Sequence, residues 1–102
     1  MDSTTRKQFR QIAHHLQPVI IIGDGGLSDG VIAETNRALQ DHELIKVKIN
    51  VLDRDERNLL AERLLETCFA ESVQLIGKVL VMYRRNDQAK AQLSNVARAR
   101  SS

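Results

Sequence analysis

The spacing of apolar residues predicts a helix, a strand and a second helix in the first part of the chain. The first helix covers residues 4–16, and its apolar stripe consists of Phe9, Ile12, Ala13 and Leu16. Pro18 prevents this helix from continuing. Residues 19–22 are all apolar, which predicts a strand that is covered on both faces. Residues 28–42 return to helical spacing, and Ser28 is placed to cap the second helix.

The pattern continues with a strand, a helix and a hairpin. Residues 44–51 alternate between apolar side chains on one face and polar side chains on the other, namely Lys46, Lys48 and Asn50. A third helix begins at Asp53, and its apolar stripe includes Leu60, Leu64 and Cys68. Two further strands, over 72–76 and 79–84, are joined at Gly77-Lys78. This short connection predicts a hairpin.

The element order is therefore α-β-α-β-α-β-β, which predicts an α/β fold with helices over a mixed four-stranded sheet. The two β-α-β crossovers favour parallel neighbours, and the hairpin adds an antiparallel strand. The chain of 102 residues fits one domain, which we place over residues 1–85. Residues 86–102 lack a strong apolar stripe, so this basic tail is either a frayed helix or disordered, and mobility is favoured.

A glycine-rich loop, Gly23-Asp24-Gly25-Gly26, connects the first strand to the second helix. Glycine permits positive φ and lets another backbone come close. The helix that follows offers unpaired N–H groups and a positive dipole end. This combination suits a phosphate group, so one hypothesis is a loop that holds a nucleotide or a nucleic-acid backbone. The alternative is a tight turn that binds no ligand.

The side chains that could perform catalysis have structural explanations. Cys68 lies among leucines on a helical stripe, which is typical of a buried thiol. His14 and His15 are adjacent, face different directions and cannot easily share a metal ion. The glycine loop lacks the lysine of a nucleoside-triphosphate site and the glycine spacing of a dinucleotide fingerprint. The sequence therefore predicts no enzyme, no cofactor and no metal site.

Charge is divided unevenly along the chain. Segments 23–43 and 53–71 carry net charges of −4 and −3, whereas 1–22 and 72–102 carry +2 and +5. Acidic helices beside basic strands and ends predict two electrostatic faces, and the basic face would suit a polyanion. The alternative is that these charges only solvate the surface. A single cysteine and no apolar run of roughly 20 residues predict a cytoplasmic protein without a membrane span.

Several segments, in this order and spacing, resemble a known family. They are Ile12-Ala13-His14, Leu16, Pro18-Val19, Gly23-Asp24-Gly25-Gly26-Leu27-Ser28, Ala38-Leu39, His42-Glu43-Leu44-Ile45-Lys46-Val47-Lys48 and Ile76-Gly77-Lys78-Val79-Leu80-Val81-Met82-Tyr83-Arg84. Together they resemble the YhbY-type proteins of bacteria, the stand-alone form of the CRM domain (chloroplast RNA splicing and ribosome maturation). The resemblance covers about residues 4–85.

The resemblance implies an RNA-binding domain related in fold to the C-terminal domain of bacterial initiation factor three. It also implies association with precursors of the large ribosomal subunit. The family's G-x-x-G loop falls on Gly23–Gly26 and is similar to the loop by which KH domains clamp a nucleic-acid backbone. Family loops often carry a basic or neutral polar residue at the second position, whereas this chain has Asp24.

The resulting hypothesis is a small monomeric protein that binds ribosomal RNA and assists ribosome assembly. Amides around Gly25 and Gly26 would approach the RNA backbone, and cationic side chains would surround them. The candidate binding residues are Gly23, Asp24, Gly25, Gly26, Lys46, Lys48, Lys78, Arg84, Arg6, Lys7 and Arg10. Tyr83 is the only tyrosine and the chain lacks tryptophan, so stacking of bases on an aromatic platform is not expected.

Two other functions fit parts of the sequence. The first is an interaction adaptor whose acidic helices dock a basic protein, with ribosomal proteins as the partners to consider. The second is a small enzyme that uses His14 or Cys68, although the partner residues that such chemistry needs are missing. Binding to RNA with a steep salt dependence would favour the RNA-binding hypothesis over both of these functions.

Overall fold

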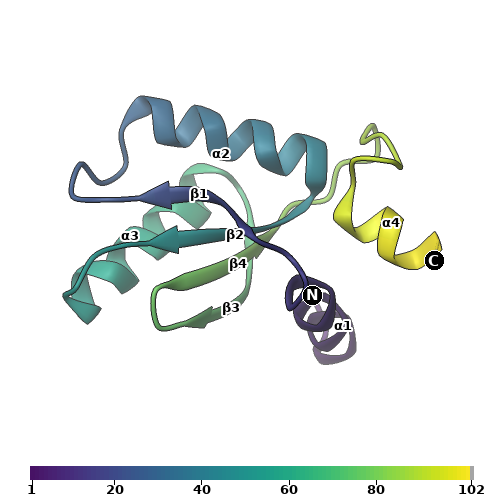
Figure 1. Ribbon diagram of the computed structural model, residues 1–102, viewed down its shortest axis with the longest axis horizontal. Helices are drawn as coiled ribbons and strands as arrows, with labels where there is room; N and C mark the ends of the chain where they lie inside the picture. The colour runs from purple at the N-terminus through teal and green to yellow at the C-terminus, as the bar shows by residue number, and fades with distance from the viewer. Residues whose placement is uncertain (102) are drawn as a thin grey trace.

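The computed structural model describes residues 1–101, which fold around one four-stranded sheet (Figure 1). Its elements, in chain order, are α1 (Ser3–Ala13), β1 (Pro18–Ile22), α2 (Asp29–His42), β2 (Leu44–Ile49), α3 (Arg54–Thr67), β3 (Glu71–Ile76), β4 (Val79–Tyr83) and α4 (Asn95–Ser101). The order predicted from the sequence is confirmed, and α4 is added to it. The first helix ends at Ala13, three residues before its predicted end.

The strands lie in the order β1-β2-β4-β3, so the predicted mixed sheet is confirmed. β1 and β2 are parallel neighbours, as their crossover through α2 requires. β4 is antiparallel to both β2 and β3. The prediction of a second parallel pair of neighbours is wrong, because the hairpin folds β4 back into the position between β2 and β3.

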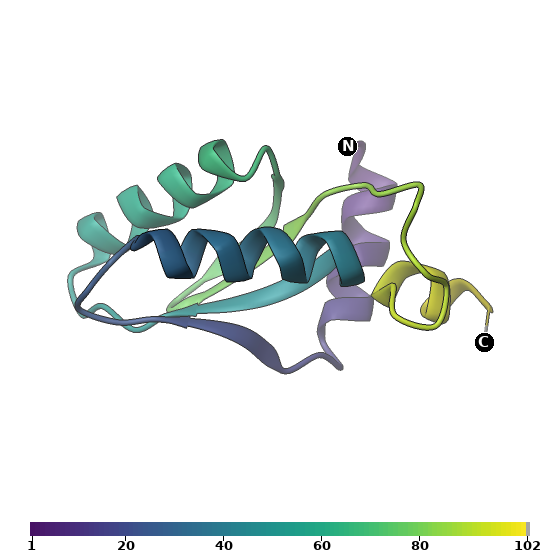
Figure 2. The same ribbon diagram turned by 90° about the horizontal axis from the view of Figure 1, so that it is seen from above.

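The helices form two layers on opposite faces of the sheet. Helices α2 and α3 run along one face and bury a core that includes Ile22, Leu39, Ile45, Val47, Ile49, Leu64, Leu80 and Met82. Helices α1 and α4 gather at one end of the molecule (Figures 1 and 2) and pack on the other face. Their smaller core contains Phe9, Ala13, Leu44, Val73, Val81 and Val96. This second layer covers only part of its face.

Both predicted helix caps are present. The Ser28 hydroxyl accepts a hydrogen bond from the amide of Val31 at 3.2 Å. The Asp53 carboxylate accepts one from the amide of Glu56 at 2.9 Å. Each cap satisfies a first-turn amide that the helix itself cannot pair, which explains why α2 and α3 begin where they do.

Strand β1 departs from the prediction that both of its faces are covered. Ile20 and Ile22 are buried under α2 and α3, but the side chains of Val19 and Ile21 are 50% and 66% exposed. The reason is the position of β1 at the edge of the sheet, together with the limited reach of α1 and α4. An apolar run alone does not distinguish an edge strand from a central one.

The segment after residue 85, predicted to be mobile, packs against the domain, and Ser102 lies outside the described residues. Val96 is buried on the smaller core. The Asn95 side-chain amide donates to the Leu44 carbonyl at 2.7 Å. Glu43 accepts from the Ser94 hydroxyl at 2.7 Å and from the Asn86 amide at 2.9 Å. Polar contacts therefore hold this segment, and an apolar pattern does not reveal them.

Candidate nucleic-acid interface

The glycine loop, Gly23–Gly26, is a tight turn at the carboxyl end of β1. The Gly26 amide donates to the Gly23 carbonyl at 3.0 Å, which places Asp24 and Gly25 at the tip. Within residues 1–101, the amides of Asp24 and Gly25 have no protein acceptor. The sequence pointed to the amides of Gly25 and Gly26, but the turn itself uses that of Gly26. The loop therefore offers the two tip amides to a ligand.

The three glycines of the loop differ in backbone conformation and in the space around them. Gly26 has a φ of +64°, and a Cβ there would lie 3.8 Å from a Leu60 methyl group. A Cβ at Gly23 or Gly25 would meet nothing within 4 Å, and neither has a positive φ. Only Gly26 thus requires glycine for backbone conformation. The other two leave the outside of the loop open to a close approach.

Three segments bring the loop and two lysines to one corner of the sheet. The Asn50 amide donates to the Ile22 carbonyl at 2.7 Å, which ties the end of β2 to the loop. The ammonium group of Lys78, in the β3–β4 turn, donates to the Asn50 side-chain oxygen at 3.2 Å. Lys48 lies beside Ile21 in the register of β1 and β2. The fold thus brings the glycine loop, Lys48 and Lys78 to one corner, although they are far apart along the chain; that they form a binding site remains a prediction.

Other basic groups lie on the same side of the sheet. Lys46 and Lys48 alternate with the buried residues of β2 and so face the side that α1 and α4 partly cover. Lys48 is exposed and Lys46 is half-buried. Lys7 and Arg10 are exposed on α1. The acidic segments 23–43 and 53–71 contain α2 and α3, on the opposite side. The sheet thus separates a basic layer from an acidic one.

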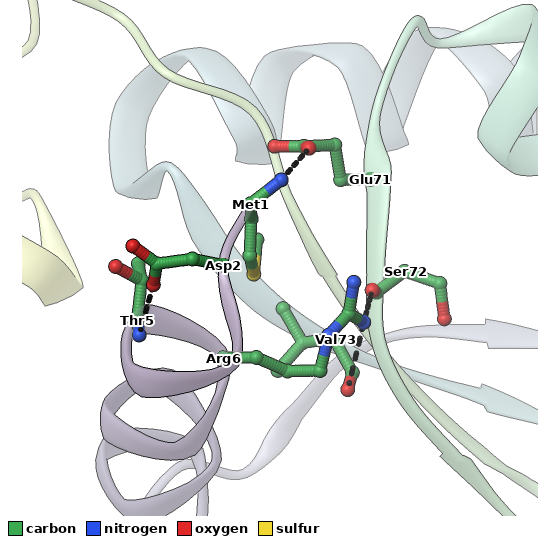
Figure 3. Close-up of polar contacts among 7 residues, drawn as sticks. All are labelled: Met1, Asp2, Thr5, Arg6, Glu71, Ser72 and Val73. Carbon is green, nitrogen blue, oxygen red and sulfur yellow. Dashed lines mark hydrogen bonds and ion pairs between the residues drawn. The ribbon is translucent and has the colours of Figure 1, made fainter.

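Arg6, a predicted binding residue, is engaged inside the fold. Its guanidinium donates to the carbonyls of Ser72 and Val73 on β3 (Figure 3). Nearby, the N-terminal ammonium group pairs with Glu71 at 3.1 Å. The Thr5 amide donates to Asp2 and lowers the pKa of that carboxyl. These contacts attach the start of α1 to the edge strand β3. Arg6 therefore stabilises the packing of α1.

Arg84 is also engaged inside the fold. Its guanidinium donates to the Asn36 side chain at 2.8 Å, to the Cys68 carbonyl at 2.8 Å and to the Asn36 carbonyl at 3.0 Å. One side chain therefore joins the end of β4 to both α2 and α3. These donors face the helix layer rather than the basic side of the sheet. We leave Arg84 and Arg6 out of the interface.

The aromatic residues do not form a stacking platform. Tyr83 packs against the buried ring of Phe9, with ring centroids 4.5 Å apart. Burial, followed by the charge of Glu43, raises the pKa of Tyr83. Phe69 is 88% exposed and follows α3 with a φ of +53°. The sequence analysis missed Phe69, because the apolar stripe of that helix ends at Cys68.

The cysteine and histidine side chains that were considered for catalysis do not form a reactive group in the structure. Cys68 is fully buried among the α3 and sheet residues, and burial raises the pKa of its thiol. His14 and His15 are exposed, and the ring of His42 donates to the Leu93 carbonyl at 2.8 Å. In residues 1–101, no group of three or more histidine, cysteine or acidic side chains could hold a metal ion.

Replacing Cys68 by Ser is expected to lower the free energy of unfolding by about 1–3 kcal/mol, because a hydroxyl would be buried among leucines. Replacement by Ala should cost less, since it adds no polar group. Chemical denaturation measures both values, and RNA binding by the folded fraction should persist in each. A serine variant with full stability but no function would point to a reactive thiol instead.

Comparisons with known proteins agree on one family. A sequence profile of the CRS1/YhbY (CRM) domain matches residues 1–84. A probable RNA-binding protein of Pseudomonas aeruginosa is 47% identical over 93 residues, covering 91% of this chain and 89% of the relative. An RNA-binding protein of Haemophilus influenzae is 47% identical over 92 residues, covering 89% and 93%.

A solved structure shows the same fold. A hypothetical protein of Staphylococcus aureus, described with a proposed RNA-binding role, superposes with a TM-score of 0.76 at 33% identity. The match covers 88% of this chain and 94% of that one. None of the helices over residues 1–101 is long and apolar enough to cross a membrane.

Proposed function

Because the chain belongs to the CRS1/YhbY (CRM) domain family, we infer that it binds RNA, and that its target is ribosomal RNA in precursors of the large subunit. The relatives named as RNA-binding proteins support the first part. The resemblance to YhbY-type proteins supports the second. The protein acts as a monomer in the bacterial cytoplasm and assists assembly by binding rather than by catalysis.

One observation carries this proposal: the glycine loop, Lys48 and Lys78 converge at one corner of the sheet. The unpaired amides of Asp24 and Gly25 are donors that suit a phosphate oxygen. The two lysines supply the charge that phosphate binding needs. Lys46 extends this basic surface along β2. Lys7 and Arg10 extend it along α1, on the same side of the sheet.

The double variant Lys46→Ala/Lys48→Ala tests the sheet part of the interface. Loss of two phosphate contacts should weaken RNA binding and reduce the salt slope by about 0.7 per contact for single-stranded RNA. The free energy of unfolding should change by less than about 0.5 kcal/mol, because Lys48 is exposed, Lys46 is half-buried and both point away from the larger core. Binding titrations over a series of salt concentrations measure the slope. An unchanged affinity and slope would exclude the sheet from the interface.

A second candidate function is favoured by one observation on the acidic side. Phe69 exposes its ring at the end of α3, close in sequence to Glu66 and Glu71, and such a ring is a typical anchor for a protein partner. A basic ribosomal protein would complement this side. Binding of a purified ribosomal protein that is lost on Phe69→Ser, with RNA affinity intact, would establish this function.

A further inference from the structure

The part of the sheet that α1 and α4 leave uncovered presents a continuous row of side chains. In the pairing register, Ile21 lies beside Lys48, Lys48 opposite Val79, and Val79 opposite Ile76. One residue from each of the four strands thus contributes to the row. The side chains of Ile21 and Ile76 are 66% and 65% exposed, and Lys48 is exposed between them. We call this row, with Val19 and Lys46 beside it, the open face.

The open face differs from an ordinary solvated surface. Single exposed aliphatic residues are common, but here exposed β-branched residues from both edge strands lie in one line across the sheet. With strands ~4.8 Å apart, the row spans about 14 Å. On β1, the row lies one residue before the strand ends at Ile22, and the glycine loop follows directly. The row is therefore continuous with the proposed phosphate site.

The form of the RNA decides whether these aliphatic side chains contribute to binding. A duplex presents phosphates and hydroxyl groups across its shallow groove, and its base faces are stacked inside. Isoleucine side chains would gain little from such a surface. Unpaired nucleotides expose base faces, which are flat and apolar and can cover aliphatic groups. The phosphates of the same RNA can then reach Lys48 and Lys46, which lie among the aliphatic side chains.

The lysines in the row also argue against a second copy of this chain as the occupant. If two copies met through their open faces, the interface would contain Lys46 and Lys48 of both copies, and like charges there are unfavourable. A polyanion removes this repulsion and pairs with the lysines instead. Charge complementarity and continuity with the glycine loop thus favour the same occupant.

We propose that the open face binds unpaired nucleotides, with bases covering Ile21, Val79 and Ile76 and phosphates near Lys48 and Lys46. Single-stranded regions of RNA, rather than duplexes, are then the preferred substrate class. This inference rests on the proposed RNA-binding function. An aliphatic row performs here what aromatic side chains perform in sheets that stack two or three bases.

The test compares two RNAs and three proteins. The probes are an unstructured oligonucleotide rich in uridine and adenosine, and a fully paired hairpin of the same length. The proteins are the wild type, the double variant Ile21→Ser/Ile76→Ser and the control Leu59→Ser. Leu59 is a large aliphatic residue that is 46% exposed on α3, on the acidic side. Thermal melts confirm that all three proteins are folded.

The wild type should bind the unstructured RNA at least tenfold more tightly than the hairpin. The isoleucine double variant should lose about tenfold in affinity for the unstructured RNA, with an unchanged salt slope, because only apolar contact is removed. The control should bind as the wild type does. Equal affinity for both RNAs, or normal binding by the double variant, would overturn the inference and leave RNA binding standing. Failure to bind either RNA would overturn both.

Discussion

Replacing Gly23 and Gly25 together by Asp is expected to lower RNA affinity by about 30-fold, or ~2 kcal/mol, while the protein stays folded. The two tip amides of the glycine loop can contact a phosphate only if nothing stands in front of them. Two carboxylates would fill that space and repel the phosphate as well. The effect should exceed that of the double lysine variant, because steric exclusion adds to repulsion. Fluorescence anisotropy with labelled RNA measures the affinities.

The control for this variant is Gly23→Ala/Gly25→Ala, which adds bulk without charge. A Cβ at either position meets no neighbouring atom, and neither glycine has a positive φ. The free energy of unfolding of both double variants should therefore lie within about 1 kcal/mol of that of the wild type. The alanine variant should lose less affinity than the aspartate variant, and the difference reports the charge. A folded aspartate variant with normal RNA binding would show that the loop is only a turn.

Gly26 is unsuited to this experiment. Its φ of +64° is costly for any residue with a Cβ, so a substitution there strains the backbone whether or not RNA is bound. A loss of binding could then follow from a loss of folding. The two kinds of glycine in one short loop look alike in the sequence, and only the structure separates them.

The sequence predicted the elements because each carries a local signal. Alternation along β2, the apolar stripes of α1 and α3, and the caps at Ser28 and Asp53 are all set by neighbours within a few residues. The Gly77 turn is equally local, and its φ of +56° agrees with the hairpin. The position of β4 between β2 and β3 has no such signal, since it depends on which strands meet after the chain has folded back.

The candidate site was predicted in part for the same reason. The loop and Lys48 lie close to one another through the parallel pairing of β1 and β2, which the crossover predicts. Arg6 and Arg84 were assigned to the interface from charge alone. Their partners are carbonyl groups and an asparagine far along the chain, which composition does not identify. The exposure of Ile21 was missed because an apolar residue in a strand is ordinarily assigned to the core.

Replacing Arg84 by Ala is expected to lower the free energy of unfolding by about 2–4 kcal/mol, because hydrogen bonds from a charged group are lost and their acceptors are left half-buried. For a domain of this size, the melting temperature should fall by about 10–20 °C. The loss should be large because one guanidinium joins the end of β4 to α2 at Asn36 and to Cys68, the residue that caps α3. Thermal and chemical denaturation measure the change.

The neighbouring Arg85 provides a matched control for Arg84. Its side chain is 77% exposed and pairs with Asp87 on the surface, so Arg85→Ala should leave the melting temperature nearly unchanged. Arg84→Lys should remain destabilised, because an ammonium group cannot reproduce the planar fork that reaches both Asn36 and Cys68. Below its melting temperature, the alanine variant should bind RNA as the wild type does. A stable Arg84→Ala protein that no longer binds RNA would instead return Arg84 to the interface, where its charge alone had placed it.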